Sequence, residues 1–130
     1  MIVMDASALL ELLLQTERAE RIAAIALKAS QRLRAPHLLD IEIAHVLRRL
    51  LLQGEISATR ARQALEDYRQ ITIERHAHLP FLARIFKLHP SLTAYDSAYV
   101  VLSEALDAPL LTCDARLARS HGHRASITLI

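Results

Sequence analysis

Short hydrophobic runs alternate with amphipathic stretches along the chain. Residues 2–4 form an apolar run that stops at Asp5, and the leucine-rich segment after it predicts a helix that begins at once. Residues 71–73, 109–113 and 127–130 predict three further strands, while the intervening sequence has mostly helical periodicity. Strands alternating with helices predict an α/β fold, a three-layer α/β/α sandwich around a central, mostly parallel sheet.

Local start and stop signals bound the predicted helices. Gly54 is placed to follow the C-terminus of one helix, Ser57 to cap the next, and Thr93 to open another, while Pro36 suits a first helical turn. The predicted ranges are 6–14, 17–29, 38–53, 58–69, 80–87, 94–106 and 114–119. No repeat, linker or low-complexity segment interrupts them, so residues 1–130 are predicted to form a single domain.

The composition and the first residues of the sequence indicate in which cellular compartment the protein functions. With 130 residues, 52% of them hydrophobic, the chain is large enough to form a hydrophobic core without disulfides or structural metals. Its single cysteine, Cys113, cannot form an intramolecular disulfide. No basic segment precedes the first apolar residues, and no uncharged apolar run approaches ~18 residues. We therefore expect a cytoplasmic protein without a signal peptide or a membrane span.

The small number of glycines excludes several classes of protein, and the basic residues are compatible with nucleic-acid binding. Only Gly54 and Gly122 occur, which excludes a Walker loop, a GxGxxG turn and a GxSxG nucleophile elbow. The 16 Lys+Arg residues against 14 Asp+Glu include only two lysines, and the arginine excess is compatible with binding RNA or DNA phosphate. A genome that favours arginine codons explains the same excess equally well.

Four acidic residues stand out because apolar sequence flanks them. Asp5 and Asp114 end predicted strands, and ligands of open α/β sheets bind at the carboxyl ends of strands. Glu42 shares a predicted helix face with apolar residues, and so does Asp96 in a later helix. Asp5, Asp96 and Asp114 are equally well explained as helix-capping residues. Glu42 has no such role, and Arg49 is the only basic residue near it on its helix face.

Convergence of these acids at one sheet edge favours a metal site. Carboxylates gathered there repel one another unless a cation lies between them. All-oxygen ligation selects a hard ion, so we expect Mg²⁺ or Mn²⁺. Sites of this kind hydrolyse phosphodiesters by activating water and stabilising the leaving oxygen.

Four short motifs, in order and spacing, resemble the PIN-domain ribonucleases, and among them the VapC-type toxins of bacterial toxin–antitoxin modules. The motifs are Val-Met-Asp-Ala-Ser at 3–7, residues 36–49, Thr-Ala-Tyr-Asp-Ser-Ala-Tyr at 93–99 and Leu-Thr-Cys-Asp-Ala-Arg-Leu at 111–117. The resemblance spans nearly the whole chain. It implies a metal-dependent endoribonuclease toxin that a cognate VapB-type antitoxin inhibits.

The resemblance also implies roles for individual residues. Asp5 and Asp96 would be the principal Mg²⁺ or Mn²⁺ ligands, Glu42 and Asp114 would complete the catalytic acidic cluster, and Ser7 and Thr112 would be polar supports beside it. Ser7 is equally compatible with a first-turn hydrogen bond, and Thr112 with an ordinary strand position.

Other features are less specific. Arg116 and Arg119 lie three residues apart and are candidates for RNA phosphate binding or for a solvated face. The paired histidines at 76 and 78, and at 121 and 123, lack the further ligands that a zinc site needs. The leucine run at 9–14 indicates deep core or an exposed docking surface, which the resemblance would assign to a second copy of the chain or to an antitoxin helix.

Two other functions compete with an RNA-cleaving enzyme. A non-catalytic α/β protein-binding module would use the acids as helix caps and the leucines as a docking surface. A phosphatase or phospho-acceptor built on Asp5 would need a second aspartate two residues on, where the chain has Ser7, or a late lysine, and no lysine follows Lys87.

Overall fold

The computed structural model describes residues 1–130 apart from His89 and Ser91, and at its centre is a five-stranded sheet. The strands pair in the order β3-β2-β1-β4-β5, and every pair is parallel. Their bounds are β1 (Ile2–Met4), β2 (Leu33–Pro36), β3 (Ile73–His76), β4 (Leu110–Thr112) and β5 (Ile127–Leu129). The predicted α/β class and the parallel sheet are confirmed.

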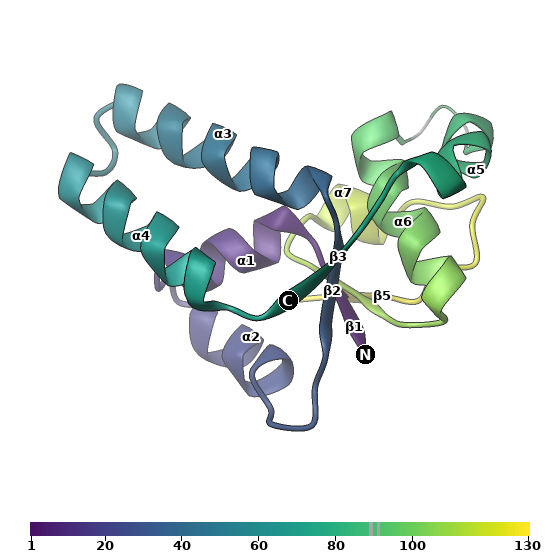
Figure 1. Cartoon of the computed structure of the whole chain (residues 1–130), viewed down its shortest axis with the longest axis horizontal. Coiled ribbons are helices and arrows are strands. Elements are labelled where there is room, and N and C mark those ends of the chain that lie inside the picture. The colour runs from purple at the N-terminus through teal and green to yellow at the C-terminus, as the bar shows by residue number, and fades with distance from the viewer. Residues whose placement is uncertain (89, 91) are drawn as a thin grey trace.

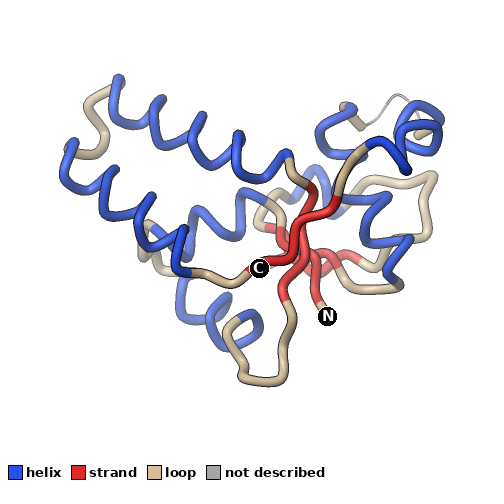
Figure 2. Tube along the Cα trace, in the orientation of Figure 1, coloured by secondary structure: helices blue, strands red, loops and turns tan. Residues whose placement is uncertain are grey.

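Helices cover both faces of this sheet. Figure 1 shows α1 to α4 on one side and α5 and α6 on the other, and Figure 2 shows the strands between these two groups. The helices of the described residues are α1 (Ala6–Leu13), α2 (Ala19–Ala26), α3 (Leu38–Leu52), α4 (Ala58–Gln70), the 3-10 helix η1 (Leu79–Phe81), α5 (Leu82–Lys87), α6 (Ala94–Leu106) and α7 (Ala115–Ala118). Among them, none has both the length and the apolar character needed to cross a bilayer.

The core lies along β1, β4 and α6. All three residues of β1 are buried, and seven consecutive residues of α6, from Ser97 to Ser103, are buried as well. In the leucine run, Leu9, Leu10 and Leu13 are buried, and Leu12 and Leu14 pack against the core. The run is therefore core, and the alternative of an exposed docking surface at this segment is wrong.

Several predicted helix signals are confirmed. The Ser57 hydroxyl accepts a hydrogen bond from the Arg60 amide at 3.0 Å at the start of α4. Thr93 accepts one from the Asp96 amide at 3.1 Å at the start of α6. Gly54 follows α3 with φ +72, a left-handed conformation that favours glycine.

The sequence prediction missed β2. Pro36 is the last residue of this strand rather than part of a helical turn, and β3 runs from Ile73 to His76 rather than over 71–73. Arg34 gives the segment a polar pattern, but in the structure its side chain pairs with Glu74 of β3. This strand is stabilised by its neighbours β1 and β3, which local sequence does not reveal. The predicted helix at 17–29 is also shorter, because α2 spans Ala19–Ala26.

Candidate active site

Two of the predicted site residues lie where adjacent parallel strands end. Asp5 directly follows β1, and its backbone amide donates to the Leu111 carbonyl of β4 at 3.0 Å. Asp114 lies two residues beyond the end of β4 and caps α7. The pairing of β1 with β4 therefore brings residues more than 100 positions apart to one edge of the sheet.

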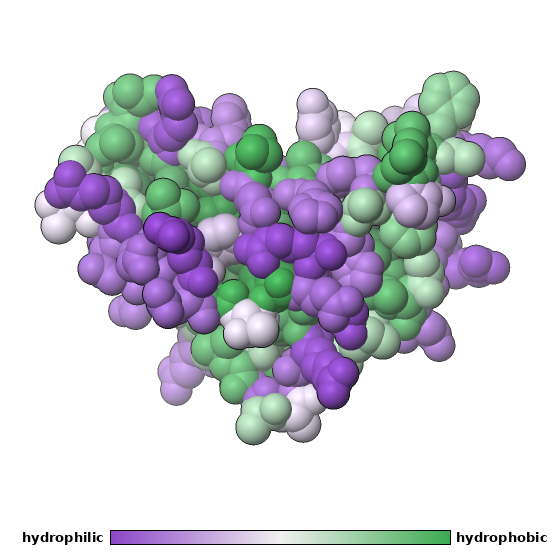
Figure 3. Space-filling view, in the orientation of Figure 1, coloured by the Kyte–Doolittle hydropathy of each residue, from purple (hydrophilic) through white to green (hydrophobic). Residues whose placement is uncertain are grey.

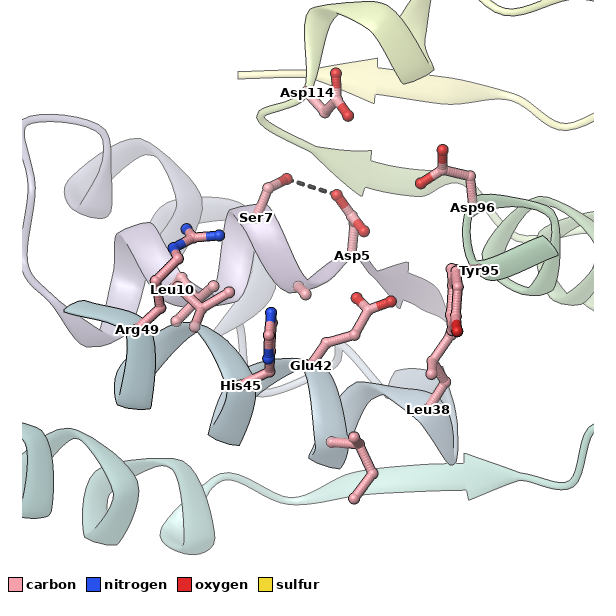
Figure 4. Close-up of a pocket in the computed structure, with 13 residues that line it drawn as sticks. Asp5, Ser7, Leu10, Leu38, Glu42, His45, Arg49, Tyr95, Asp96 and Asp114 are labelled. Atoms are coloured by element: carbon pink, nitrogen blue, oxygen red, sulfur yellow. Dashed lines mark hydrogen bonds between the residues drawn. The ribbon is translucent and has the colours of Figure 1, made fainter. Parts of the chain in front are cut away.

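Two hydroxyl groups fix the Asp5 carboxylate. Ser7 Oγ donates to Asp5 Oδ2 at 2.5 Å, the contact drawn in Figure 4, and Thr112 Oγ1 donates to the same oxygen at 2.7 Å. Each hydroxyl also accepts a backbone N–H of the β4–α7 loop, Ser7 from Cys113 and Thr112 from Asp114, both at 3.0 Å. Asp5 makes no side-chain capping bond to α1. Its orientation is thus set by hydroxyl groups of α1 and β4, and the simple helix-cap explanation, a carboxylate that accepts amides of α1, does not hold.

Burial shifts the acid–base chemistry of this residue. Only 6% of the Asp5 surface is exposed, and desolvation raises the pKa of its carboxyl above the ordinary value despite the bonds from Ser7 and Thr112. The charge of Asp96 raises the same pKa further. Asp5 is therefore a buried acid in a locally negative environment.

The Glu42 side chain extends from α3 toward Asp5 (Figure 4). The pKa of its carboxyl is raised to about 7. Burial is the largest cause, and the charges of Asp5 and Asp96 act in the same direction, while a hydrogen bond from Tyr99 opposes the rise. That bond runs from the Tyr99 hydroxyl to Glu42 Oε2 at 3.0 Å. The sequence suggested Arg49 as the partner of Glu42, but the structure gives this role to a buried tyrosine of α6.

Asp96 and Asp114 share an arginine. Arg116 Nη2 donates to Asp96 Oδ2 at 2.8 Å and to Asp114 Oδ2 at 3.1 Å. The Asp114 carboxylate also caps α7 by accepting the amides of Arg116 and Leu117, so the capping and site interpretations are compatible for this residue. At α6 the cap is Thr93, which accepts the Asp96 amide, while the Asp96 carboxylate contacts Arg116.

A groove joins these side chains. Its volume is about 690 Å³, and α1, α3, the start of α6 and the β4–α7 loop border it. The lining consists of the four acids with Ala6, Ser7, Leu10, Leu38, Ile41, His45, Val46, Arg49 and Tyr95. Figure 4 shows Glu42 directed toward Asp5, with Tyr95 on one side of the acids and His45 and Arg49 farther along α3 on the other.

The donor set suits a hard divalent cation. Four carboxylates line one groove, and the two most desolvated have raised pKa values partly because other acids lie nearby, which is the situation that a bound cation relieves. In the described part of the chain, however, no three His, Cys, Asp or Glu side chains are grouped closely enough to hold a metal ion. The oxygen donors are therefore of the type that Mg²⁺ or Mn²⁺ prefers, whereas their spacing in this structure is not that of a formed metal site.

Two residues at the site were not singled out from the sequence: His45, which lines the groove, and Tyr99, which is buried and donates to Glu42. Tyr99 lies three residues after Asp96, and His45 lies three residues after Glu42, spacings that place each on the same helix face as that acid. Helical periodicity from the predicted acids was thus the available signal. Arg119, predicted with Arg116 to bind RNA, is exposed and is not part of the groove lining.

The paired histidines are not among the residues that line the groove. The Leu38 amide at the start of α3 donates to His78 Nε2 at 3.2 Å, and His76 lies beside Arg34 and Glu74. His123 contacts Ser120 at 2.8 Å.

The fold and the strand-end acids define a class of protein. Residues 2–121 match the PIN domain, and the chain belongs to this family. Over its full length it is 38% identical to VapC ribonuclease Mb0985 of Mycobacterium bovis, covering 98% of that protein, and 37% identical to Ribonuclease VapC12 of Mycobacterium tuberculosis, covering 99%. These full-length matches place it with the VapC members of the family.

A solved structure supports the fold independently. The crystal structure of PAE2754 from Pyrobaculum aerophilum superposes with a TM-score of 0.70 at 22% sequence identity. The match covers 97% of this chain and 81% of the other. At this level of identity the likeness concerns the fold alone.

Proposed function

We propose that the protein is a metal-dependent endoribonuclease that hydrolyses RNA phosphodiester bonds. The observation that carries this proposal is the convergence of Asp5, Glu42, Asp96 and Asp114 on one groove at the carboxyl ends of β1 and β4. Its VapC relatives are named ribonucleases, which supports the same activity. The acids give the groove the charge that a hard divalent cation would balance.

Each acid has a proposed part in holding the cation. Asp5 and Asp96 would hold Mg²⁺ or Mn²⁺, directly or through water, and Glu42 and Asp114 would complete the oxygen ligands. When bound, the cation lowers the pKa of the attacking water and offsets the charge of the leaving oxygen. Ser7 and Thr112 keep Asp5 directed toward the ion, and Tyr99 does the same for Glu42.

The groove also suits a nucleic-acid strand. Tyr95 is 64% exposed and offers an aromatic face next to Asp96, and such faces stack on unpaired bases. His45 and Arg49 line the same groove on α3, and Arg49 offers a guanidinium to backbone phosphate.

We also propose the partners and the location that a VapC toxin would have. These are a cognate VapB-type antitoxin that covers the groove, a homodimer, and the cytoplasm. Exposed apolar side chains support protein contacts: Leu79, Leu82 and Phe86 form a stripe at helical spacing on η1 and α5. Because a twofold dimer buries one such patch against its own copy, we assign this stripe to the homodimer.

Cleavage of RNA by the purified protein tests the function. We expect a single-stranded RNA to be cut internally with Mg²⁺ or Mn²⁺ present and to remain intact with a chelator. Asp5→Asn and Asp96→Asn should each slow cleavage by about 100-fold or more, because each variant removes a charge from the metal site. Asp107→Asn is the matched control, since Asp107 is exposed at the far end of α6 and Asn tolerates its left-handed backbone.

Circular dichroism melts of all three variants separate lost chemistry from lost folding. Cleavage at the parent rate by folded Asp5→Asn and Asp96→Asn would show that the mechanism is wrong. If the parent protein neither cleaves RNA nor binds a divalent ion in calorimetry, the non-catalytic binding module becomes the better explanation.

A further inference from the structure

Arg116 occupies the position between two of the proposed metal ligands. Its Nη2 lies 2.8 Å from Asp96 Oδ2 and 3.1 Å from Asp114 Oδ2, so one nitrogen bridges α6 and the β4–α7 loop. Its own amide donates to Asp114 Oδ1 at 2.8 Å, which fixes the first turn of α7. The side chain is thus anchored at its base and carries its charge into the site.

The four acids form two groups that differ in the hydrogen-bond donors of their carboxylates. Asp5 and Glu42 are held by neutral hydroxyl groups, those of Ser7, Thr112 and Tyr99. Asp96 and Asp114 are held by the guanidinium instead. No three acids of the described residues are grouped for a metal ion, and two of the four, Asp96 and Asp114, form ion pairs with Arg116.

An arginine and a divalent ion that share the same two oxygen atoms lie close together and repel each other, so each weakens the binding of the other. The Arg116 nitrogen is within bonding distance of both, and a cation placed on them would meet a positive charge at contact distance. The Arg116 side chain is 55% exposed, and exposed ion pairs of this kind contribute little to stability. A doubly charged ion is therefore the stronger ligand for these oxygens, and the arginine can leave without disrupting the core.

The displaced guanidinium would remain close to the site. The capped first turn of α7 holds its Cα, and the other donors of the planar guanidinium suit two oxygens of one phosphate. We propose that Arg116 competes with the divalent cation for Asp96 and Asp114 and, once displaced, binds a phosphate of the RNA substrate. The second half of this inference rests on the proposed nuclease function, whereas the first half concerns metal binding alone.

The inference predicts opposite effects of one substitution. Arg116→Ala should bind Mn²⁺ alone more tightly than the parent, by about threefold to tenfold, because the competing exposed ion pairs are gone. The same variant should cleave RNA about tenfold or more slowly at saturating Mn²⁺, because a charge-assisted bond to phosphate is lost. Arg116→Lys should keep Mn²⁺ affinity near the parent value but restore cleavage only in part, since lysine lacks the planar fork.

The measurements are Mn²⁺ titration by electron paramagnetic resonance or calorimetry, and cleavage rates over a range of RNA concentrations. Arg119→Ala serves as the control for long-range charge in the Mn²⁺ titration, because Arg119 has the same charge three residues away but, among the described residues, forms no ion pair with Asp96 or Asp114. Its Mn²⁺ affinity should stay within about twofold of the parent.

Three outcomes would overturn the inference. Equal tightening of Mn²⁺ binding in Arg116→Ala and Arg119→Ala would reduce the effect to net charge. Unchanged Mn²⁺ affinity in Arg116→Ala, with a parent protein that binds Mn²⁺ and cleaves RNA, would refute the competition and leave the proposed function intact. A parent protein that neither binds Mn²⁺ nor cleaves RNA would refute both.

Discussion

Asp5 and Glu42 are the least solvated acids of the groove, and they differ in what holds them. Asp5 receives two hydroxyl donors on one oxygen, whereas Glu42 receives one from Tyr99. Burial raises both pKa values, that of Glu42 to about 7. At neutral pH without a cation, each residue therefore lies in an environment that disfavours its own charge.

This environment predicts how stability depends on pH. The folded protein retains a proton on Glu42 up to about pH 7, whereas the unfolded chain releases it near the ordinary value of 4.5, so stability falls as the pH rises through this window. The shift of Asp5 acts in the same direction. The full shift of the Glu42 pKa corresponds to about 3 kcal/mol. Because Glu42 is only half-buried and solvent screens its charge, we expect the free energy of unfolding to drop by about 1 to 3 kcal/mol across the window.

Thermal melts across this pH range measure the effect, and Glu42→Gln is the control because it cannot titrate. The pH dependence should be shallower in Glu42→Gln, and added Mg²⁺ should reduce it in the parent protein. Identical slopes in the two proteins would assign the pH dependence to other groups.

At the scale of elements, α3 provides one wall of the groove, and its groove-facing side chains change from apolar to acidic to basic along the helix. Its groove-facing positions pass from Leu38 through Glu42 to His45 and Arg49. The sequence places Arg48 and Arg49 side by side, but only Arg49 lines the groove. One helix thus carries a proposed metal ligand and a proposed phosphate-binding group on the same face.

The two arginines provide a matched pair of variants. In an Asp5→Asn background that does not cleave, Arg49→Ala should weaken RNA binding and lower the slope of log affinity against log salt by about 1, because one phosphate contact is lost. Arg48→Ala should leave the slope unchanged. Fluorescence anisotropy at several salt concentrations gives these slopes, and equal slopes for both variants would remove Arg49 from the RNA path.

The elements also show what the sequence could predict. Most helices and strands were predicted because Ser57, Thr93 and Gly54 mark helix ends and apolar runs mark buried strands. β2 was missed because Arg34 and Pro36 conceal a strand that only its neighbours stabilise. The four acids were found from their positions at strand ends and on apolar helix faces, but the contacts of Tyr99 with Glu42 and of Arg116 with Asp96 arise from tertiary packing.

At the scale of the whole molecule, exposed hydrophobic residues occur at both outer ends of one face. Figure 3 shows them over the outer end of the α3–α4 pair and over the α5 region, with polar residues and smaller hydrophobic areas between them. Leu52, at the end of α3, is 79% exposed, and Phe86, on α5, is 91% exposed. Patches of this kind are typical of protein contact sites.

Their separation makes the proposed homodimer testable. Phe86→Asp should convert a dimer to a monomer, because it places a charge at the centre of the Leu79, Leu82 and Phe86 stripe. Leu52→Asp should leave the dimer intact, because it alters the other patch. Sedimentation of both variants measures the assembly, and dissociation of Leu52→Asp but not of Phe86→Asp would move the interface to the α3–α4 end.

The bond between Thr112 and Asp5 has a consequence for the timing of synthesis. The two partners lie 107 positions apart in the sequence, and β4 lies next to β1 in the sheet. A chain still being translated therefore lacks the hydroxyl of Thr112 and the carboxylate of Asp114 until more than a hundred residues have been added after Asp5. The proposed four-acid site can assemble only after this point of synthesis.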